Sequence, residues 1–263
     1  MRLPNGIVVV ALLVCASASA CGSSSSGSDT PDAGASNGDA ATATDAGVND
    51  GGSFLDAATA LDAGAGDAGD SVAELLALTA SCTQVSSGLF ALNAGDTPTV
   101  PICGLTGAVF WKADMDIDCD GKQTAQCNLT ADPDYQNQTA AVDSMGNPLD
   151  AANLPYVVVP GKSARFDSAS AGLAHGSVIL VLYKNQIGYA VFGDVGPSAD
   201  IGEASYATAV ELGIDPNPSS GGVDGPDVLY VAFTGSSGIA SPIENHAQAV
   251  SVGQARLAAL LGH

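Results

Sequence analysis

Apolar residues in this chain of 263 occur mostly in short runs separated by segments rich in Gly, Pro and Asn. Short runs rich in Val, Ile, Phe and Tyr between such breaks favour β-strands over helices. The two runs on either side of Lys184-Asn185-Gln186 predict a hairpin. The predicted strands are Gly107–Ile117, Pro155–Pro160, Ser177–Tyr183, Ile187–Gly193 and Val228–Phe233.

Three further segments are predicted to be helical. Ser71–Ala80 has Ser71 as a possible cap with Glu74 three residues later. Ala247–Leu261 is rich in Ala, Leu and Gln, and its apolar residues recur at roughly helical spacing. Glu203–Leu212 is the third, and Glu203 would open it, where the helix dipole favours an anion. The pattern as a whole predicts a mainly β fold, a barrel or sandwich with a few peripheral helices.

The first twenty residues have the layout of a signal peptide, with Arg2, an apolar run over Ile7–Val14 and then small residues. Two hypotheses follow from Cys21. Either a peptidase cuts after Ala20 and the protein is secreted, or Cys21 is lipidated and anchors the chain at a bacterial cell surface, because the pattern resembles a bacterial lipoprotein box. In both cases the protein would work in an oxidising compartment.

Residues 21–70 are predicted to form a disordered tether. The segment from residue 22 to residue 70 contains nine Asp and no Lys or Arg, and Asp-Ala-Gly recurs in it. A segment with so little apolar surface cannot offset the entropy lost on ordering its backbone. The folded domain is therefore predicted to span residues 71–263.

The whole chain has a formal net charge of −21, and residues 71–263 keep −13, with 19 acidic and six basic side chains. This acidity argues against binding to nucleic acid or to anionic membrane surfaces, so a lipid anchor would be the one link to a membrane. Two interpretations remain. The charge provides solubility, or it attracts a cationic substrate.

Four cysteines lie in the predicted domain, namely Cys82, Cys103, Cys119 and Cys127. An even number in an oxidising compartment indicates two disulfides, and three pairings are possible. Cys82–Cys103 and Cys119–Cys127 close the shortest loops and are preferred. A zinc site is not expected, because there is no C-x-x-C pair and the chain has three His.

Common nucleophile and phosphate motifs, such as G-x-S-x-G, H-E-x-x-H and the phosphate loop, are absent from the predicted domain. His175 and His246 are interpreted as ordinary polar residues. Carboxylates are the abundant chemical groups. Paired Asp and Glu residues cleave glycosidic bonds, where one protonates the leaving oxygen and the other assists water or the sugar.

One carboxylate group lies on the first predicted strand, where Asp114, Asp116 and Asp118 alternate with apolar residues and should share one face. Three interpretations stay open: a cation-binding cleft wall, a solvated strand end, or the start of a calcium loop over Asp116–Gly121. A calcium loop needs Glu at its twelfth position, where this chain has Cys127.

Two more carboxylates lie in distinctive segments. Asp194 follows a continuous apolar strand and stands between Gly193 and Gly196, which permit close approach of a ligand. Asp194 could equally cap a turn. Glu203 lies in Ile-Gly-Glu-Ala-Ser and could be an ordinary residue at a helix start.

Together these segments resemble the chitosanases of glycoside hydrolase family 75. The resemblance covers roughly residues 107–235 and implies inverting endo-hydrolysis of β-1,4 links between glucosamine units by an Asp and a Glu, here Asp194 and Glu203. It also implies a single six-stranded barrel akin to double-psi barrels. The motifs occur in family order: W-x-x-D-M-D-I-D-C-D-G, D-P-x-Y-Q-x-x-T, L-P-Y-V-V-V-P, Y-A-V-F-G-D, G-E-A-S and D-V-L-Y-V-A-F.

The resemblance implies chitosan as the partner. From their charge and their shared face, we expect Asp114, Asp116 and Asp118 to bind its ammonium groups. We expect a monomer that needs no cofactor and no metal. Of the two catalytic carboxyls, Glu203 is favoured as the acid and Asp194 as the base. Alternative hypotheses are a non-catalytic surface lipoprotein that binds polysaccharide, a peptidoglycan-cleaving enzyme on a related barrel, and a calcium-dependent structural module.

Overall fold

The computed structural model describes residues 65–263 of the chain. The predicted signal peptide, Cys21 and most of the predicted tether lie outside these residues. None of the helices within residues 65–263 combines the length and apolar character that a membrane span requires.

Six strands close into a barrel, and a seventh strand, β1 (Cys103–Leu105), pairs with β2 alone. The first and last strands of the order given below pair with each other. This pairing closes the barrel, so it has no free edge. The mainly β, single-barrel prediction is confirmed. In order around the barrel the strands are β2 (Ala108–Asp118), β6 (Glu203–Ser205), β3 (Tyr156–Pro160), β5 (Gln186–Gly196), β4 (Val178–Tyr183) and β7 (Val223–Phe233).

Both faces of the barrel wall are apolar. Alternate residues along each strand point into two separate cores, one inside the barrel and one outside it. The inner core holds Trp111, which stacks on Tyr230 with ring centroids 5.3 Å apart. The outer core includes Tyr189 and Leu257 and is covered by helices. This double burial explains why the strands are continuous apolar runs.

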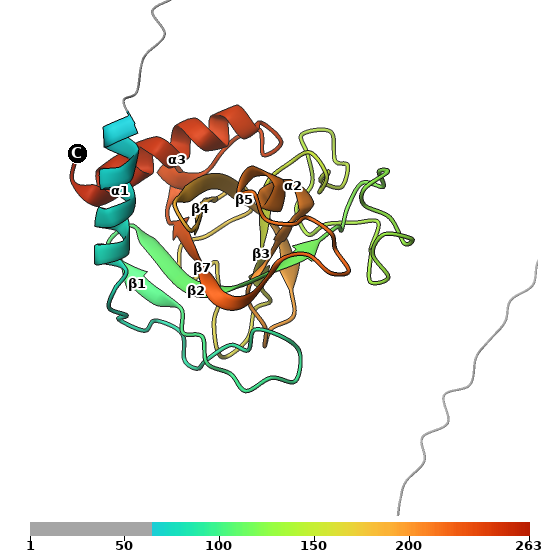
Figure 1. The fold of residues 1–263 in the computed structure, drawn as a ribbon, viewed down its shortest axis with the longest axis horizontal. Helices are drawn as coiled ribbons and strands as arrows, with labels where there is room; N and C mark the ends of the chain where they lie inside the picture. Colours follow the sequence, from blue (N-terminus) through green and yellow to red (C-terminus); the bar gives the residue numbers. More distant parts are fainter. Residues whose placement is uncertain (1–64) are drawn as a thin grey trace, which may run out of the picture. The chain divides into compact units, whose positions relative to one another are not determined.

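Within the described part of the chain, three α-helices accompany the barrel: α1 (Ala65–Leu78), α2 (Tyr206–Glu211) and α3 (His246–Leu261). Helices α1 and α3 lie side by side (Figure 1). They confirm the first and last predicted helices. However, α1 begins at Ala65, so it takes in the last residues of the segment predicted to be a disordered tether.

The prediction of a helix over Glu203–Leu212 was wrong at its start. Glu203–Ser205 forms the short strand β6, which fits between β2 and β3 and pairs with both. The helix begins only at Tyr206, because the Ser205 side chain caps it by accepting a hydrogen bond from Thr208 N. Glu203 is therefore a strand residue and does not lie at a helix N-terminus.

The predicted hairpin is present, with Tyr183 of β4 paired to Gln186 of β5. Lys184 in the tight turn has φ of 54°, in the left-handed region that such turns require. The structure joins Cys82 to Cys103 and Cys119 to Cys127, the pairing that closes the shortest loops. The second disulfide closes the loop that directly follows β2.

Candidate active site

Backbone pairing sets four residues in one row across four neighbouring strands. Asp116 of β2 pairs with Glu203 of β6, Glu203 also pairs with Val158 of β3, and Val158 pairs on its other side with Asp194 of β5. Residues directly opposite each other in a sheet point to the same face. The row therefore brings Asp194 and Glu203 together, one on each side of an apolar residue.

A β-bulge directs Asp194 to this face. Val157 pairs with Phe192 and the next residue, Val158, pairs with Asp194, so Gly193 is the extra residue. Phe192 belongs to the inner core and Val158 to the outer core, and the bulge places Asp194 level with Val158. A Cβ on Gly193 would lie 2.6 Å from Tyr156 Cβ, so a side chain at this position would disrupt the bulge.

The Asp194 carboxyl is tightly held and 8% exposed. Its Oδ1 atom accepts hydrogen bonds from Ala140 N and from Val195 N, both at 2.7 Å. Burial raises the pKa of Asp194, while these two N–H groups favour the charged form and oppose the rise. Among residues 65–263 no group donates a hydrogen bond to its Oδ2 atom, so this oxygen is the one suited to bind water.

Glu203 has a different environment. Burial, followed by the negative charges of Asp116 and Asp120, raises its pKa to about 7. Gly196 provides room for its side chain, since a Cβ at that position would lie 3.4 Å from Glu203 Oε2. A carboxyl with a pKa of about 7 is protonated in about half of the molecules at neutral pH and can donate that proton, which is the property of a general acid.

Two hollows meet at Glu203, and we call them together the acidic groove. One of about 540 Å³ and one of about 260 Å³ share Asp116, Pro197 and Glu203 in their walls. Among the described residues that line the larger hollow, none is basic. Seven are acidic: Asp116, Asp118, Asp120, Asp132, Asp134, Glu203 and Asp224.

The prediction that Asp114, Asp116 and Asp118 share one face fits the structure, because Met115 and Ile117 belong to the inner core. The prediction that all three form an accessible wall was wrong. Asp114 is 1% exposed and lies against Gly202, which has φ of 120° and no room for a side chain. Asp116 is exposed, whereas Asp118 is 5% exposed at the base of the groove.

Sequence reasoning did not identify three acidic residues of the groove, Asp132, Asp134 and Asp224. The first two lie in the loop after β2, which folds back so that Asp120 Oδ1 accepts a hydrogen bond from Gln136 N at 2.6 Å. The D-P-x-Y-Q segment, which begins at Asp132, carries two of these acids. Strand β7 begins at Val223, five residues earlier than predicted, and so includes Asp224, which no sequence pattern placed near Asp116.

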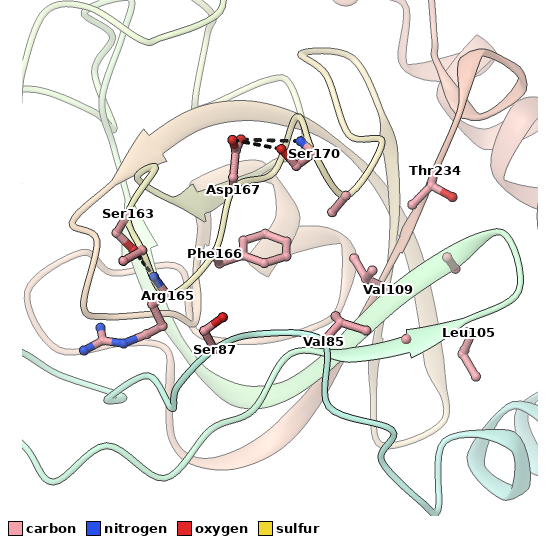
Figure 2. Close-up of a pocket in the computed structure, with 14 residues that line it drawn as sticks. Val85, Ser87, Leu105, Val109, Ser163, Arg165, Phe166, Asp167, Ser170 and Thr234 are labelled. Atoms are coloured by element: carbon pink, nitrogen blue, oxygen red, sulfur yellow. Dashed lines mark hydrogen bonds between the residues drawn. The ribbon is translucent and has the colours of Figure 1, made fainter.

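Figure 2 shows a separate hollow of about 520 Å³, and none of its lining residues lines the acidic groove. Its one acidic lining residue is Asp167, which accepts a hydrogen bond from Ser170 Oγ at 3.0 Å and pairs with Lys162. A single, paired carboxylate does not provide an acid and a base. Within residues 65–263 no three His, Cys, Asp or Glu side chains are arranged to hold a metal ion.

Comparison with known proteins points to one family. The model of the fungal chitosanases of glycosyl hydrolase group 75 matches residues 115–258. Endo-chitosanase B of Aspergillus oryzae is 31% identical over 176 residues, which cover 60% of this chain and 73% of that enzyme. An endo-chitosanase of Aspergillus fumigatus is 32% identical over 173 residues, covering 60% and 72%. The family match includes all the acidic residues that line the acidic groove and most of α3.

The buried Asp114 gives a prediction for stability. Burial and the charge of Asp116 raise its pKa to about 7, and its Oδ1 atom has no hydrogen-bond partner. The folded state therefore keeps a proton that the unfolded state loses, so stability falls as pH rises from about 4 to about 7. Asp114→Asn should raise the free energy of unfolding at pH 8 by on the order of a few kcal/mol, with little gain at pH 4.

Urea unfolding at the two pH values measures this effect. Asp227→Asn, which removes an exposed carboxylate, is the control and should change stability little at either pH. An equal effect of Asp114→Asn at pH 4 and pH 8 would contradict the prediction.

Proposed function

This chain belongs to glycoside hydrolase family 75, and we propose that it is a chitosanase that cleaves β-1,4 links within chitosan. The family match and the similarity to endo-chitosanases support a glycoside hydrolase acting on this polymer. The single observation that carries the assignment of the site is the pairing of Asp194 and Glu203 with the two sides of Val158.

Glu203 acts as the general acid in the proposed mechanism, and Asp194 as the general base. The raised pKa of Glu203, about 7, supports a protonated carboxyl that donates to the glycosidic oxygen. The two N–H donors on Asp194 Oδ1 support a carboxylate that takes a proton from water. Water then attacks the anomeric carbon as the bond to the leaving oxygen breaks.

We propose that the reaction inverts the anomeric configuration. Asp194 and Glu203 lie two strands apart, about 10 Å between their backbones at ordinary strand spacing. Inverting enzymes keep their two carboxyls about 6.5–9.5 Å apart, which leaves room for a water molecule. The row places the two side chains on one face with the width of a strand between them, which supports a site with room for that water.

Cationic sugar units bind along the acidic groove in this proposal. The glucosamine units of chitosan are partly protonated at neutral and acidic pH, and the groove offers carboxylates with no basic neighbour among its lining residues. Asp116 is the exposed member of the originally predicted wall, and Asp132, Asp134 and Asp224 extend it. Ammonium–carboxylate contacts would favour chitosan over acetylated chitin, whose amides are neutral.

The first prediction concerns the catalytic pair. Asp194→Asn and Glu203→Gln should each lower kcat on soluble chitosan by at least about 100-fold, because each removes one proton-transfer group. Glu74→Gln on α1 is the control and should match the parent. The assay resolves oligosaccharides by chromatography and follows the first-formed anomer by NMR, and the α-anomer is expected for inversion.

Other outcomes decide between the alternatives. Binding of chitosan without products, unaffected by both substitutions, would indicate a polysaccharide-binding protein. Clearing of cell-wall preparations with no action on chitosan would indicate a peptidoglycan-cleaving enzyme. A melting temperature that falls on chelation would support the calcium-dependent module.

The second prediction concerns pH. Since Glu203 must be protonated, kcat/KM should fall as pH rises through about 7, the pKa of the free protein, and kcat should also fall on the alkaline side of its profile. Asp116→Asn removes one of the negative charges that raise the Glu203 pKa, so the alkaline limb of the kcat profile should move to lower pH. Profiles measured at saturating chitosan test this shift. A limb that stays in place in Asp116→Asn would argue against Glu203 as the acid.

We also propose that the protein works outside the cytoplasm, attached through a lipid on Cys21. The signal-peptide pattern and the two disulfides support an oxidising location. Cells expressing the full chain and fed a labelled fatty acid should label the parent and not Cys21→Ser. An unlabelled parent in the medium would indicate cleavage after Ala20 and secretion instead.

A further inference from the structure

One buried carboxyl of the acidic groove has no part in the proposed mechanism. Asp118 ends β2, two residues beyond Asp116, and its side chain points to the same face. Asp116 pairs with Glu203 and Asp118 pairs with Ser205. The Asp118 side chain therefore lies diagonally across from Glu203, within reach of its long side chain.

A hydrogen bond from the backbone holds the Asp118 carboxyl in place. Its Oδ1 atom accepts a hydrogen bond from Asp120 N at 2.6 Å. The Tyr156 hydroxyl donates to Asp120 O at 2.9 Å, and the nearby Asp118 carboxyl contributes to raising the pKa of this hydroxyl. Because Asp118 is 5% exposed, it is poorly placed to meet a sugar ammonium group in the open groove.

The charges around Asp118 oppose its ionisation. Burial raises its pKa well above the ordinary value, and the nearby acids raise it further. Two adjacent carboxyls in one site do not ionise together, and the more deeply buried one retains its proton. The titratable groups that face it are Glu203 from β6, Asp194 from β5, Tyr156 from β3, and Asp116 and Asp120 from its own segment.

We propose that Asp118 is a positioning residue that stays a neutral carboxylic acid and donates a hydrogen bond to Glu203. The inference rests on the proposed function. When the Glu203 proton passes to the glycosidic oxygen and the C–O bond breaks, Glu203 becomes a carboxylate. Asp118 keeps its own proton and stabilises that new charge through the hydrogen bond. This role replaces the expected contact of Asp118 with a sugar ammonium group.

Two substitutions test the role in the full chain. Asp118→Ala removes the donor, so kcat should fall about 10- to 100-fold with KM nearly unchanged. The Glu203 carboxylate would also lose a stabilising hydrogen bond, so the alkaline limb of the kcat profile should move to higher pH. Asp118→Asn keeps an N–H donor and should restore most of the lost kcat and return the limb toward the parent.

A shift of the alkaline limb of the kcat profile to lower pH in Asp118→Ala would overturn the proposal. If Asp118 were an anion that binds substrate, both variants would raise KM, and the limb would move to lower pH as a negative charge is lost. Asp116→Asn, which should show that downward shift, is the matched control. A limb that does not move in Asp118→Ala would also overturn the proposal.

Protonation of Asp118 can be read without substrate. The protein is labelled with 13C at its Asp carboxyls, and the Asp118 resonance is identified as the one missing from the spectrum of Asp118→Asn. In the parent protein this resonance should not titrate between pH 4 and pH 7. Titration of that resonance within this range would overturn the proposal, even if Asp118→Ala did not fold. If the parent makes no product from chitosan, the proposed function fails, and the NMR result still reports separately on Asp118.

Discussion

The pairing of Val158 with two strands at once is the constraint on which the site depends. Asp194 reaches it from β5 and Glu203 from β6, although the two residues belong to different segments of the chain. Closure of the barrel through β2 and β7 prevents these strands from sliding past one another. The extra residue Gly193 then sets which face Asp194 occupies. A shift of one residue in any of these pairings would separate the two carboxyls.

Unbalanced negative charge is the second feature of the site. Seven carboxyl groups line the larger hollow with no basic residue among them, and burial raises the pKa of Glu203 and of Asp118. Such crowding destabilises the folded state and is the kind of local conflict that is found at functional sites. A cationic polymer would supply the missing positive charge. The same crowding raises the pKa of Glu203, so in the proposed mechanism binding and catalysis would use one electrostatic arrangement.

The loop after β2 forms one wall of the groove, and local contacts hold it there. The Cys119–Cys127 disulfide closes the loop, and Tyr135 Oη donates to Gly121 O at 2.7 Å. Asp120 links strand β2 to the loop that follows it, since its N–H donates to the Asp118 carboxyl and its own carboxylate accepts a hydrogen bond from Gln136 N. The groove is thus built from a rigid barrel strand and a loop that is tied to that strand, which limits how far its carboxylates can move apart.

Much of this protein follows from its sequence. Double burial of the barrel wall appears as continuous apolar runs, so the strands were predictable, as were the helices at both ends of the domain and the segments holding Asp194 and Glu203. Local patterns failed at Glu203–Ser205, because a strand of three residues exists only through its partners β2 and β3. They also could not show that Asp114 is buried while Asp116 is open, since alternation gives the face of a residue and not what covers it. Composition and motif determined the class of chemistry. Tertiary structure decided which carboxyls meet, because strand register and burial join residues far apart in the chain.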